Sequence, residues 1–150
     1  MLKLVHVADL TILVAEPIEI GRAPAGIRRV IPITGGEAKG PKIRGQILAA
    51  GADFQLLRRD GVTELQARYA LKTTDGALIY IENTGLRYGP ADAVEKLRRG
   101  EPVDPALIYL RTAPRFETAA EPYLWLTKHL FAGDAVRRPD RVELAVYQVT

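Results

Sequence analysis

The chain contains no cysteine and no serine among its 150 residues. Without cysteine it forms no disulfide and offers neither a thiolate metal ligand nor a cysteine nucleophile, a composition that fits a reducing compartment. Without serine, a serine–histidine–acid triad is excluded whatever the fold. Long apolar runs are also missing, since the longest near the start covers residues 10–15, too short for a membrane span or a signal-peptide core. We therefore expect a cytoplasmic protein with no membrane partner.

Neither sign of charge is in large excess. The 21 basic and 18 acidic residues leave a formal net charge of +3. Arginine doublets such as Arg28-Arg29 and Arg137-Arg138 occur along the chain, but neighbouring side chains of a strand point to opposite faces, so a doublet there forms no basic patch. No basic run is interleaved with aromatic residues, and we expect no nucleic-acid partner.

Length and composition predict one globular domain over residues 1–150, because 47% of the residues are hydrophobic and 26% are charged. Many segments are rich in β-branched and aromatic residues, which favours strands. The predicted strands are residues 2–14, 27–33, 43–49, 54–58, 63–72, 77–84, 107–112, 125–132 and 141–149. Asp60-Gly61 and Asp75-Gly76 are typical of hairpin turns, because glycine reaches a positive φ at little steric cost.

Only one segment predicts a helix. Residues 90–99 begin with a proline suited to a first helical turn, end in basic residues and precede Gly100, which can cap a helix. The glycine-rich residues 35–40 are interpreted as a turn, because they lack the ending of a phosphate-binding loop. Residues 114–123 are interpreted as an ordered loop. About eight to ten strands, one short peripheral helix and no βαβ alternation predict an all-β fold, a closed or nearly closed antiparallel β-barrel.

A barrel of about eight strands has either a packed interior or a small cavity. Side chains alternate between the two faces of a strand, so Tyr80 shares a face with Glu82, and Tyr109 shares one with Arg111. Faces that combine tyrosine with charge favour a cavity. The residues predicted to bind a ligand there are Arg68, Tyr109, Arg111 and Trp125.

Each of these assignments has a structural alternative. A guanidinium offers a planar fork of donors to a carboxylate or carbonyl group, but Arg68 and Arg111 would also suit a solvated outer face. A tyrosine such as Tyr109 is common in β-sheet cores when its hydroxyl is satisfied, and Trp125 suits a core anchor as well as a pocket wall.

Three further residues, Asp53, Tyr80 and Glu117, are catalytic candidates. Asp53 serves as a general base if apolar neighbours raise its pKa. An aspartate at the beginning of a strand, however, more often accepts hydrogen bonds from backbone amides. Glu117 could act as acid or base, or could pair with an arginine. The hydroxyl of Tyr80 could stabilise a developing oxyanion or could be a satisfied core group.

Metal chemistry has little support in the sequence. His6 and His129 are the only histidines, and neither stands in a His-x-His or Glu-x-x-His motif. A metal site would need both of them together with distant carboxylates. We expect no metal and no cofactor.

Several motifs in a fixed order resemble one known family. They are residues 40–45, 51–54, 60–61, 68–69, 75–80, 109–118 and 123–126. Over nearly the whole chain they look like the bacterial and fungal UPF0311 family, also called DUF3237. The resemblance implies a β-barrel in a largely uncharacterised family, so it supports the fold more than a reaction. The polar and aromatic positions that match the family pattern are Asp53, Arg68, Tyr80, Arg111, Glu117 and Trp125.

The leading hypothesis is a barrel that binds a small, largely apolar organic molecule bearing a carbonyl or carboxylate group. If it is an enzyme, the missing nucleophiles favour cofactor-independent proton transfer, as in an isomerase, cyclase or hydratase. The alternative is a non-catalytic structural domain whose filled interior binds nothing and whose outer faces form a homo-oligomer.

Overall fold

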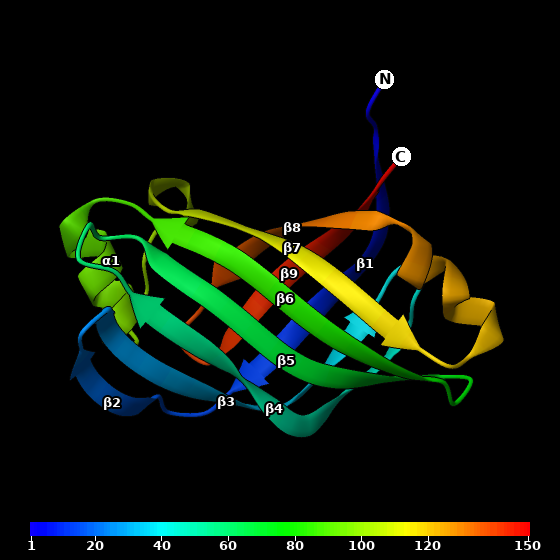
Figure 1. Cartoon of the computed structure of the whole chain (residues 1–150), viewed down its shortest axis with the longest axis horizontal. Helices are drawn as coiled ribbons and strands as arrows, with labels where there is room; N and C mark the ends of the chain where they lie inside the picture. The colour runs from blue at the N-terminus through cyan, green and yellow to red at the C-terminus, as the bar shows by residue number, and fades with distance from the viewer.

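The computed structural model describes residues 1–150 and contains nine β-strands, one α-helix and two 3₁₀ helices (Figure 1). The strands are β1 (Leu4–Val14), β2 (Ile18–Ala23), β3 (Gly26–Lys39), β4 (Gly45–Leu57), β5 (Thr63–Thr73), β6 (Leu78–Tyr88), β7 (Tyr109–Thr118), β8 (Leu130–Arg137) and β9 (Arg141–Val149). The helices are α1 (Ala91–Arg98), η1 (Pro105–Leu107) and η2 (Glu121–Lys128). None of these helices has the length and apolar character needed to cross a membrane.

The strands form one antiparallel sheet in the order β1-β9-β8-β7-β6-β5-β4-β3-β2, and β1 also pairs with β3. This last pairing closes eight strands into a ring and leaves β2 outside it, paired only with β3. Strand β3 can serve both neighbours because its first half pairs with β2, at Ile27 for example, while Gly35 to Lys39 pair with β1. The predicted all-β barrel of about eight to ten strands is confirmed, and the structure adds two 3₁₀ helices, η1 and η2, to the one helix predicted.

Two strands are longer than the sequence predicted, because glycines bend them without ending them. Residues 35–39 continue β3 instead of forming the predicted turn, and Gly36 has a φ of 134°. Residues 45–49 and 54–57 of two predicted segments belong to one strand, β4, whose pairing with β5 shifts register between Ile47 and Gly51. Such bulges let a strand coil around a barrel while its pairing continues.

Other boundaries also differ from the prediction. The short strand β2 was not predicted, and Trp125 lies in η2 instead of a strand. Strand β7 runs on through Pro114, within the predicted loop. It can do so because its pairing with β8 covers only Arg111 and Thr112, so this stretch resembles an edge strand, where proline is tolerated. By comparison, β6 shares ten paired positions with β7.

The two ends of the barrel differ in polarity. Near η2 the interior is packed with aliphatic and aromatic side chains, and Phe116 meets Phe131 edge to face with ring centroids 4.9 Å apart. The opposite end, beside α1, buries polar side chains instead, among them Arg29, Gln55 and Arg87. Helix α1 and η2 stand at opposite ends of the barrel in Figure 1. The filled end stabilises the fold, and the polar end is the candidate for a functional site.

Closure of the ring yields a first prediction. A Cβ added at Gly36 would lie 1.9 Å from the carbonyl oxygen of Thr11 on β1, whereas one added at Gly61 would meet nothing within 4 Å. Both glycines have a positive φ, so both alanine variants carry the same kind of backbone strain, roughly 1–2 kcal/mol. We expect Gly36→Ala to lower the free energy of unfolding by more than about 3 kcal/mol and Gly61→Ala by much less.

Urea unfolding of the two variants beside the unsubstituted chain measures this difference. An equal loss of unfolding free energy in the two variants would show that the close approach of β1 and β3 at Gly36 is not the constraint.

Candidate functional site

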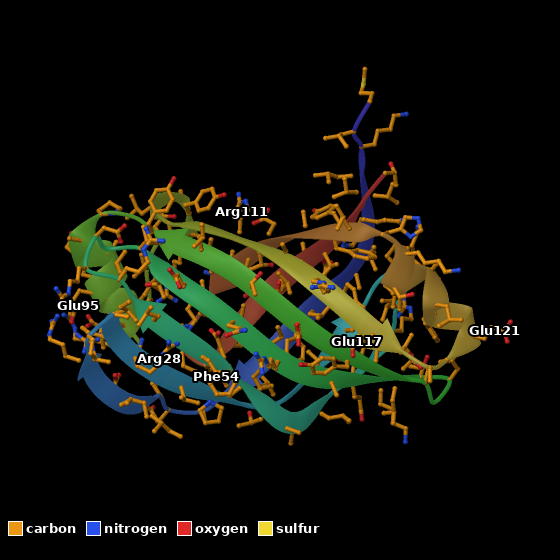
Figure 2. The ribbon with its side chains drawn as sticks, viewed as in Figure 1. Arg28, Phe54, Glu95, Arg111, Glu117 and Glu121 are labelled. Carbon is orange, nitrogen blue, oxygen red and sulfur yellow. The ribbon has the colours of Figure 1, made fainter.

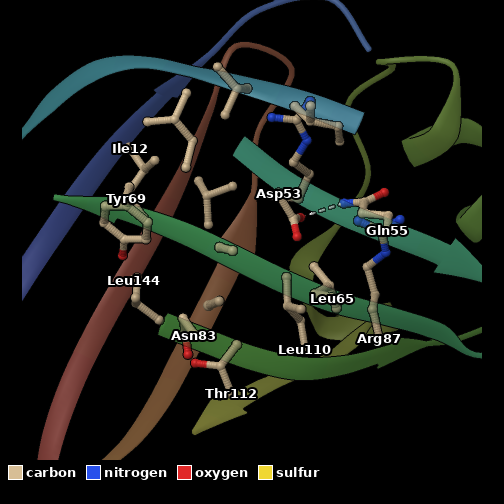
Figure 3. Close-up of a pocket in the computed structure, with 17 residues that line it drawn as sticks. Ile12, Asp53, Gln55, Leu65, Tyr69, Asn83, Arg87, Leu110, Thr112 and Leu144 are labelled. Carbon is tan, nitrogen blue, oxygen red and sulfur yellow. Dashed lines mark hydrogen bonds between the residues drawn. The ribbon is translucent and has the colours of Figure 1, made fainter. Parts of the chain in front are cut away.

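The barrel interior contains a cavity lined by 17 residues, of which 11 are hydrophobic (Figure 3). The space between the lining atoms, including the part that opens to solvent, has a volume of about 620 Å³. The part of it that the centre of a water molecule can reach is only about 50 Å³. The polar lining residues are Asp53, Gln55, Asn83, Arg87, Thr112 and Arg137, together with the tyrosine Tyr69. The cavity is therefore narrow, with apolar walls and a small set of polar groups, as is common for small-molecule sites.

Strand alternation places these side chains in the interior. Asp53 and Gln55 are two residues apart on β4, so both point inward, while Phe54 between them points outward and is 37% exposed. On β6, Asn83 and Arg87 continue the inward row that begins with buried isoleucines. The site thus consists of polar residues at positions that the barrel otherwise fills with aliphatic side chains.

Asp53 is held by two hydrogen bonds. Its Oδ2 accepts from Gln55 Nε2 at 2.9 Å, and its Oδ1 accepts from the backbone N–H of Gln66 at 3.0 Å. The β4–β5 pairing is interrupted just after Asp53 and Ala67, so the carboxylate takes a backbone donor that the ladder leaves free. The Asp53 side chain therefore accepts a hydrogen bond from a backbone amide, as the structural alternative in the sequence analysis expected. It also lines the cavity.

The surroundings of Asp53 favour its protonated form. Burial raises the pKa of Asp53 above its ordinary value, and this effect outweighs the hydrogen bond from Gln55 and the positive charge of Arg87, which both lower it. No other carboxylate lines the cavity. Asp53 is therefore the one carboxyl group in the cavity that can exchange a proton with a bound molecule.

Unpartnered polar atoms gather around the same cavity. Six buried side-chain atoms make no hydrogen bond, and five of them belong to residues that line it. These five are Gln55 Oε1, Tyr69 OH, Asn83 Oδ1, Arg87 Nε and Thr112 Oγ1. Buried polar groups are nearly always hydrogen-bonded, so a concentration of exceptions in one place calls for a functional explanation. Donors and acceptors are both present, which suits a molecule with a polar group.

Of the seven site residues predicted from the sequence, the structure places only Asp53 in the cavity. Arg68, Tyr109, Arg111 and Glu117 are exposed on the outer surface. Figure 2 shows Arg111 and Glu117 on the outer side of β7. Arg111 instead forms an ion pair with Asp134 on β8 at 2.9 Å.

The remaining two predicted residues also lie outside the cavity. Tyr80 is half-buried on the outer face, where its hydroxyl donates to Glu82 at 2.8 Å. Trp125 packs from η2 against the hydrophobic core, with Lys42 Nζ 5.3 Å from its ring centre. Alternation divided the side chains of each strand correctly between its two faces, but the face that combines tyrosine with charge was wrongly predicted to be the inner one. Burial favours the apolar face of the strand instead.

Sequence reasoning missed six polar lining residues: Gln55, Tyr69, Asn83, Arg87, Thr112 and Arg137. A signal was present for two of them. Asn83 and Arg87 interrupt an apolar face of β6 that starts with Ile79 and Ile81. A polar residue within an otherwise apolar face is informative, because its burial has to be compensated by a partner.

Comparison with known proteins places this arrangement in a family. A family model described as "Protein of unknown function (DUF3237)" matches residues 2–149. A UPF0311 protein of Rhodopseudomonas palustris is 50% identical over 144 residues, which cover 96% of this chain and 94% of that protein.

Solved structures share the fold as well. The crystal structure of a conserved protein of unknown function from Rhodopseudomonas palustris has a TM-score of 0.95 at 47% identity and covers 100% of this chain and 99% of its own. An enzyme from Penicillium herquei has a TM-score of 0.74 at 20% identity, with 99% and 95% covered. At that identity the second likeness shows the fold alone.

The site geometry predicts an unusual titration. We expect Asp53 to titrate above its ordinary pKa of 3.8, and Asp60, which is hydrogen-bonded to Arg58 on the surface, to titrate below that value. The carboxyl ¹³C shifts followed against pH measure both, with Asp53→Asn assigning the buried signal. An Asp53 signal that titrates together with Asp60 would contradict the burial effect.

The same shift has a consequence for stability. The folded chain holds the Asp53 proton to a higher pH than the unfolded chain, so the free energy of unfolding falls as pH rises from about 4 through the raised pKa. Asp53→Asn should lack this fall. Urea titrations across that range, with Asp60→Asn as the surface control, measure the difference.

Proposed function

Because this chain belongs to the DUF3237 family of β-barrel proteins, whose function is unknown, we propose that it binds a small organic carbonyl or carboxylate compound inside the barrel and moves a proton on it. Asp53 is the acid–base group in this proposal. The observation that carries it is a single carboxyl group, with its pKa raised by burial, in a cavity that also collects five unpartnered polar atoms.

A carboxyl group of raised pKa suits proton transfer, since a catalytic acid or base works best when its pKa approaches the working pH. In its ionised form, Asp53 takes a proton from the carbon next to a carbonyl. The electron pair of the C–H bond moves toward the carbonyl oxygen, and the protonated Asp53 returns the proton to the same or another atom. Isomerisation by this route needs no oxidant, reductant or cofactor.

Negative charge that develops on the substrate oxygen needs a donor. Burial and the nearby charge of Asp53 raise the pKa of Tyr69, so its hydroxyl keeps its proton and can donate a hydrogen bond. The hydroxyl of Thr112 is a second unpartnered donor in the same lining. Tyr69 thus takes the role that the sequence suggested for Tyr80.

Catalysis by this fold has a precedent among its structural neighbours. The Penicillium herquei protein is described as an enzyme, so a barrel of this shape is compatible with chemistry in general. The unpartnered polar atoms favour a ligand-binding role over a purely structural one, because a filled structural core leaves few such atoms and has no reason to gather them around one cavity.

Deuterium exchange tests the proposal without knowledge of the natural substrate. The protein is incubated in D₂O with acetophenone, cyclohexanone, pyruvate or 2-oxobutyrate, and ¹H NMR follows loss of the protons next to the carbonyl. We expect faster exchange than in buffer for at least one compound, and a rate at least about 100-fold lower in Asp53→Asn.

Two carboxyl variants on the outer surface serve as controls. Glu117→Gln removes the other carboxylate that the sequence suggested as a base, and Glu121→Gln removes an exposed one in η2. Both should exchange deuterium as the unsubstituted chain does. Exchange no faster than in buffer with all four compounds, or undiminished exchange in Asp53→Asn, would overturn the proposal.

A further inference from the structure

The cavity has an unbalanced set of charges. Two guanidinium groups line it, those of Arg87 and Arg137, against one carboxyl group, that of Asp53. Arg87 is only 2% exposed, and its Nε has no hydrogen-bond partner. The side chain of Arg137 makes one long contact, from Nη1 to the carbonyl oxygen of Arg141 at 3.5 Å. Neither arginine forms an ion pair with a carboxylate of the chain.

Another buried arginine nearby, Arg29, shows how the chain treats such a charge where its role is structural. Arg29 is 3% exposed, and its Nε donates to Glu19 Oε1 at 2.9 Å. Its Nη2 donates to the carbonyl oxygen of Arg98 at 3.0 Å, which ties β3 to the end of α1. Arg29 thus has an ion pair and a backbone carbonyl as protein partners. Burial of an unpaired charge is costly, so the lack of partners at Arg87 and Arg137 indicates a role outside the fold itself.

Both unpaired arginines carry charge at neutral pH. Burial lowers the pKa of Arg87 to about 10, helped by the positive charges of Arg137 and Arg29, and opposed by the charge of Asp53. Burial also lowers the pKa of Arg137. With two guanidinium groups against one carboxyl group, this end of the cavity is positive overall whether Asp53 is ionised or protonated. A positive, poorly solvated site attracts an anion strongly.

The shape of the cavity orients such an anion. Arg137 also lines a surface groove beside the end of α1, together with Arg98 and Asp140, so it stands between the cavity and solvent. The walls farther inside are aliphatic, with Ile12 and Leu144 among them. A molecule with one anionic group and an apolar body would place its charge at the α1 end and its body toward the barrel centre.

We propose that the molecule bound in this cavity is a small carboxylic acid, whose carboxylate is held by the unpaired guanidinium groups of Arg87 and Arg137 while its apolar body lies against the aliphatic wall. The inference rests on the proposed function and narrows its substrate class from carbonyl or carboxylate compounds to carboxylates. A guanidinium suits this role because its planar donors match the two carboxylate oxygens.

Pairs of isosteric probes test the charge requirement. Benzoate is compared with benzamide, and butyrate with butyramide, by titration followed through backbone amide shifts of Gln55, Asn83 and Ala135, which line the cavity. We expect each carboxylate to bind at least about tenfold more tightly than its amide, the ratio that one additional charge-assisted hydrogen bond supplies.

Substitution of the arginines locates the contact. In Arg137→Gln the preference for carboxylate should fall at least about fivefold while the affinity for the amides is retained, and Arg137→Lys should restore part of it. Arg115→Gln, on the exposed face of β7, should leave all four affinities unchanged. Arg87→Gln should act as Arg137→Gln does; if it does not fold, the Arg137 variants carry the test.

Two results would overturn the inference, and each has a different consequence for the proposed function. Equal binding of acids and amides, unaffected by Arg137→Gln, would reject the carboxylate and leave a neutral carbonyl ligand in the same cavity. No shift of any cavity amide with either pair would also reject it, and the deuterium exchange of the four carbonyl compounds then decides the proposed function by itself.

Discussion

Pairing of β1 with the second half of β3 is the constraint on which the rest of this structure depends. It closes eight strands into a ring, and closure turns one face of every strand into an interior of fixed size. Each inward position must then be filled by a side chain of suitable volume or left to form a cavity. Near η2 the inward positions are aliphatic and aromatic and fill the space. Near α1 polar side chains stand among the aliphatic ones, and part of the space remains open.

Much of the fold could be predicted from the sequence. The all-β barrel, the helix near residues 91–98 and the last strand follow from β-branched content, turn glycines and helix-end residues. The errors have local causes. Gly36 and Gly51 were treated as chain breaks, but in a coiled sheet they permit bulges that continue a strand. Trp125 lies in a 3₁₀ helix because tertiary packing of an apolar segment overrides its strand propensity.

The site was harder to predict than the fold. Asp53 was identified because an aspartate stands out beside glycine and a strand, whereas Arg87 and Arg137 fall outside the predicted strands 77–84, 125–132 and 141–149, so alternation assigned them to no face. Alternation specifies which residues share a face but not which face is inner, and that choice depends on the sum of burial over all strands. Once the apolar faces are turned inward, Asn83 and Arg87 become buried polar residues, and the cavity follows from them.

The joints of the ring are unequal, and this has a consequence for how molecules reach the interior. Strands β7 and β8 share only two paired positions, backed by the ion pair of Arg111 with Asp134, whereas β8 and β9 share eight. A region with few backbone hydrogen bonds opens at a lower free energy than its neighbours. We therefore expect this joint to open at the lowest free energy in the ring. Because Thr112 on β7 and Ala135 on β8 both line the cavity, such an opening would expose the interior while the other strand pairs keep their register.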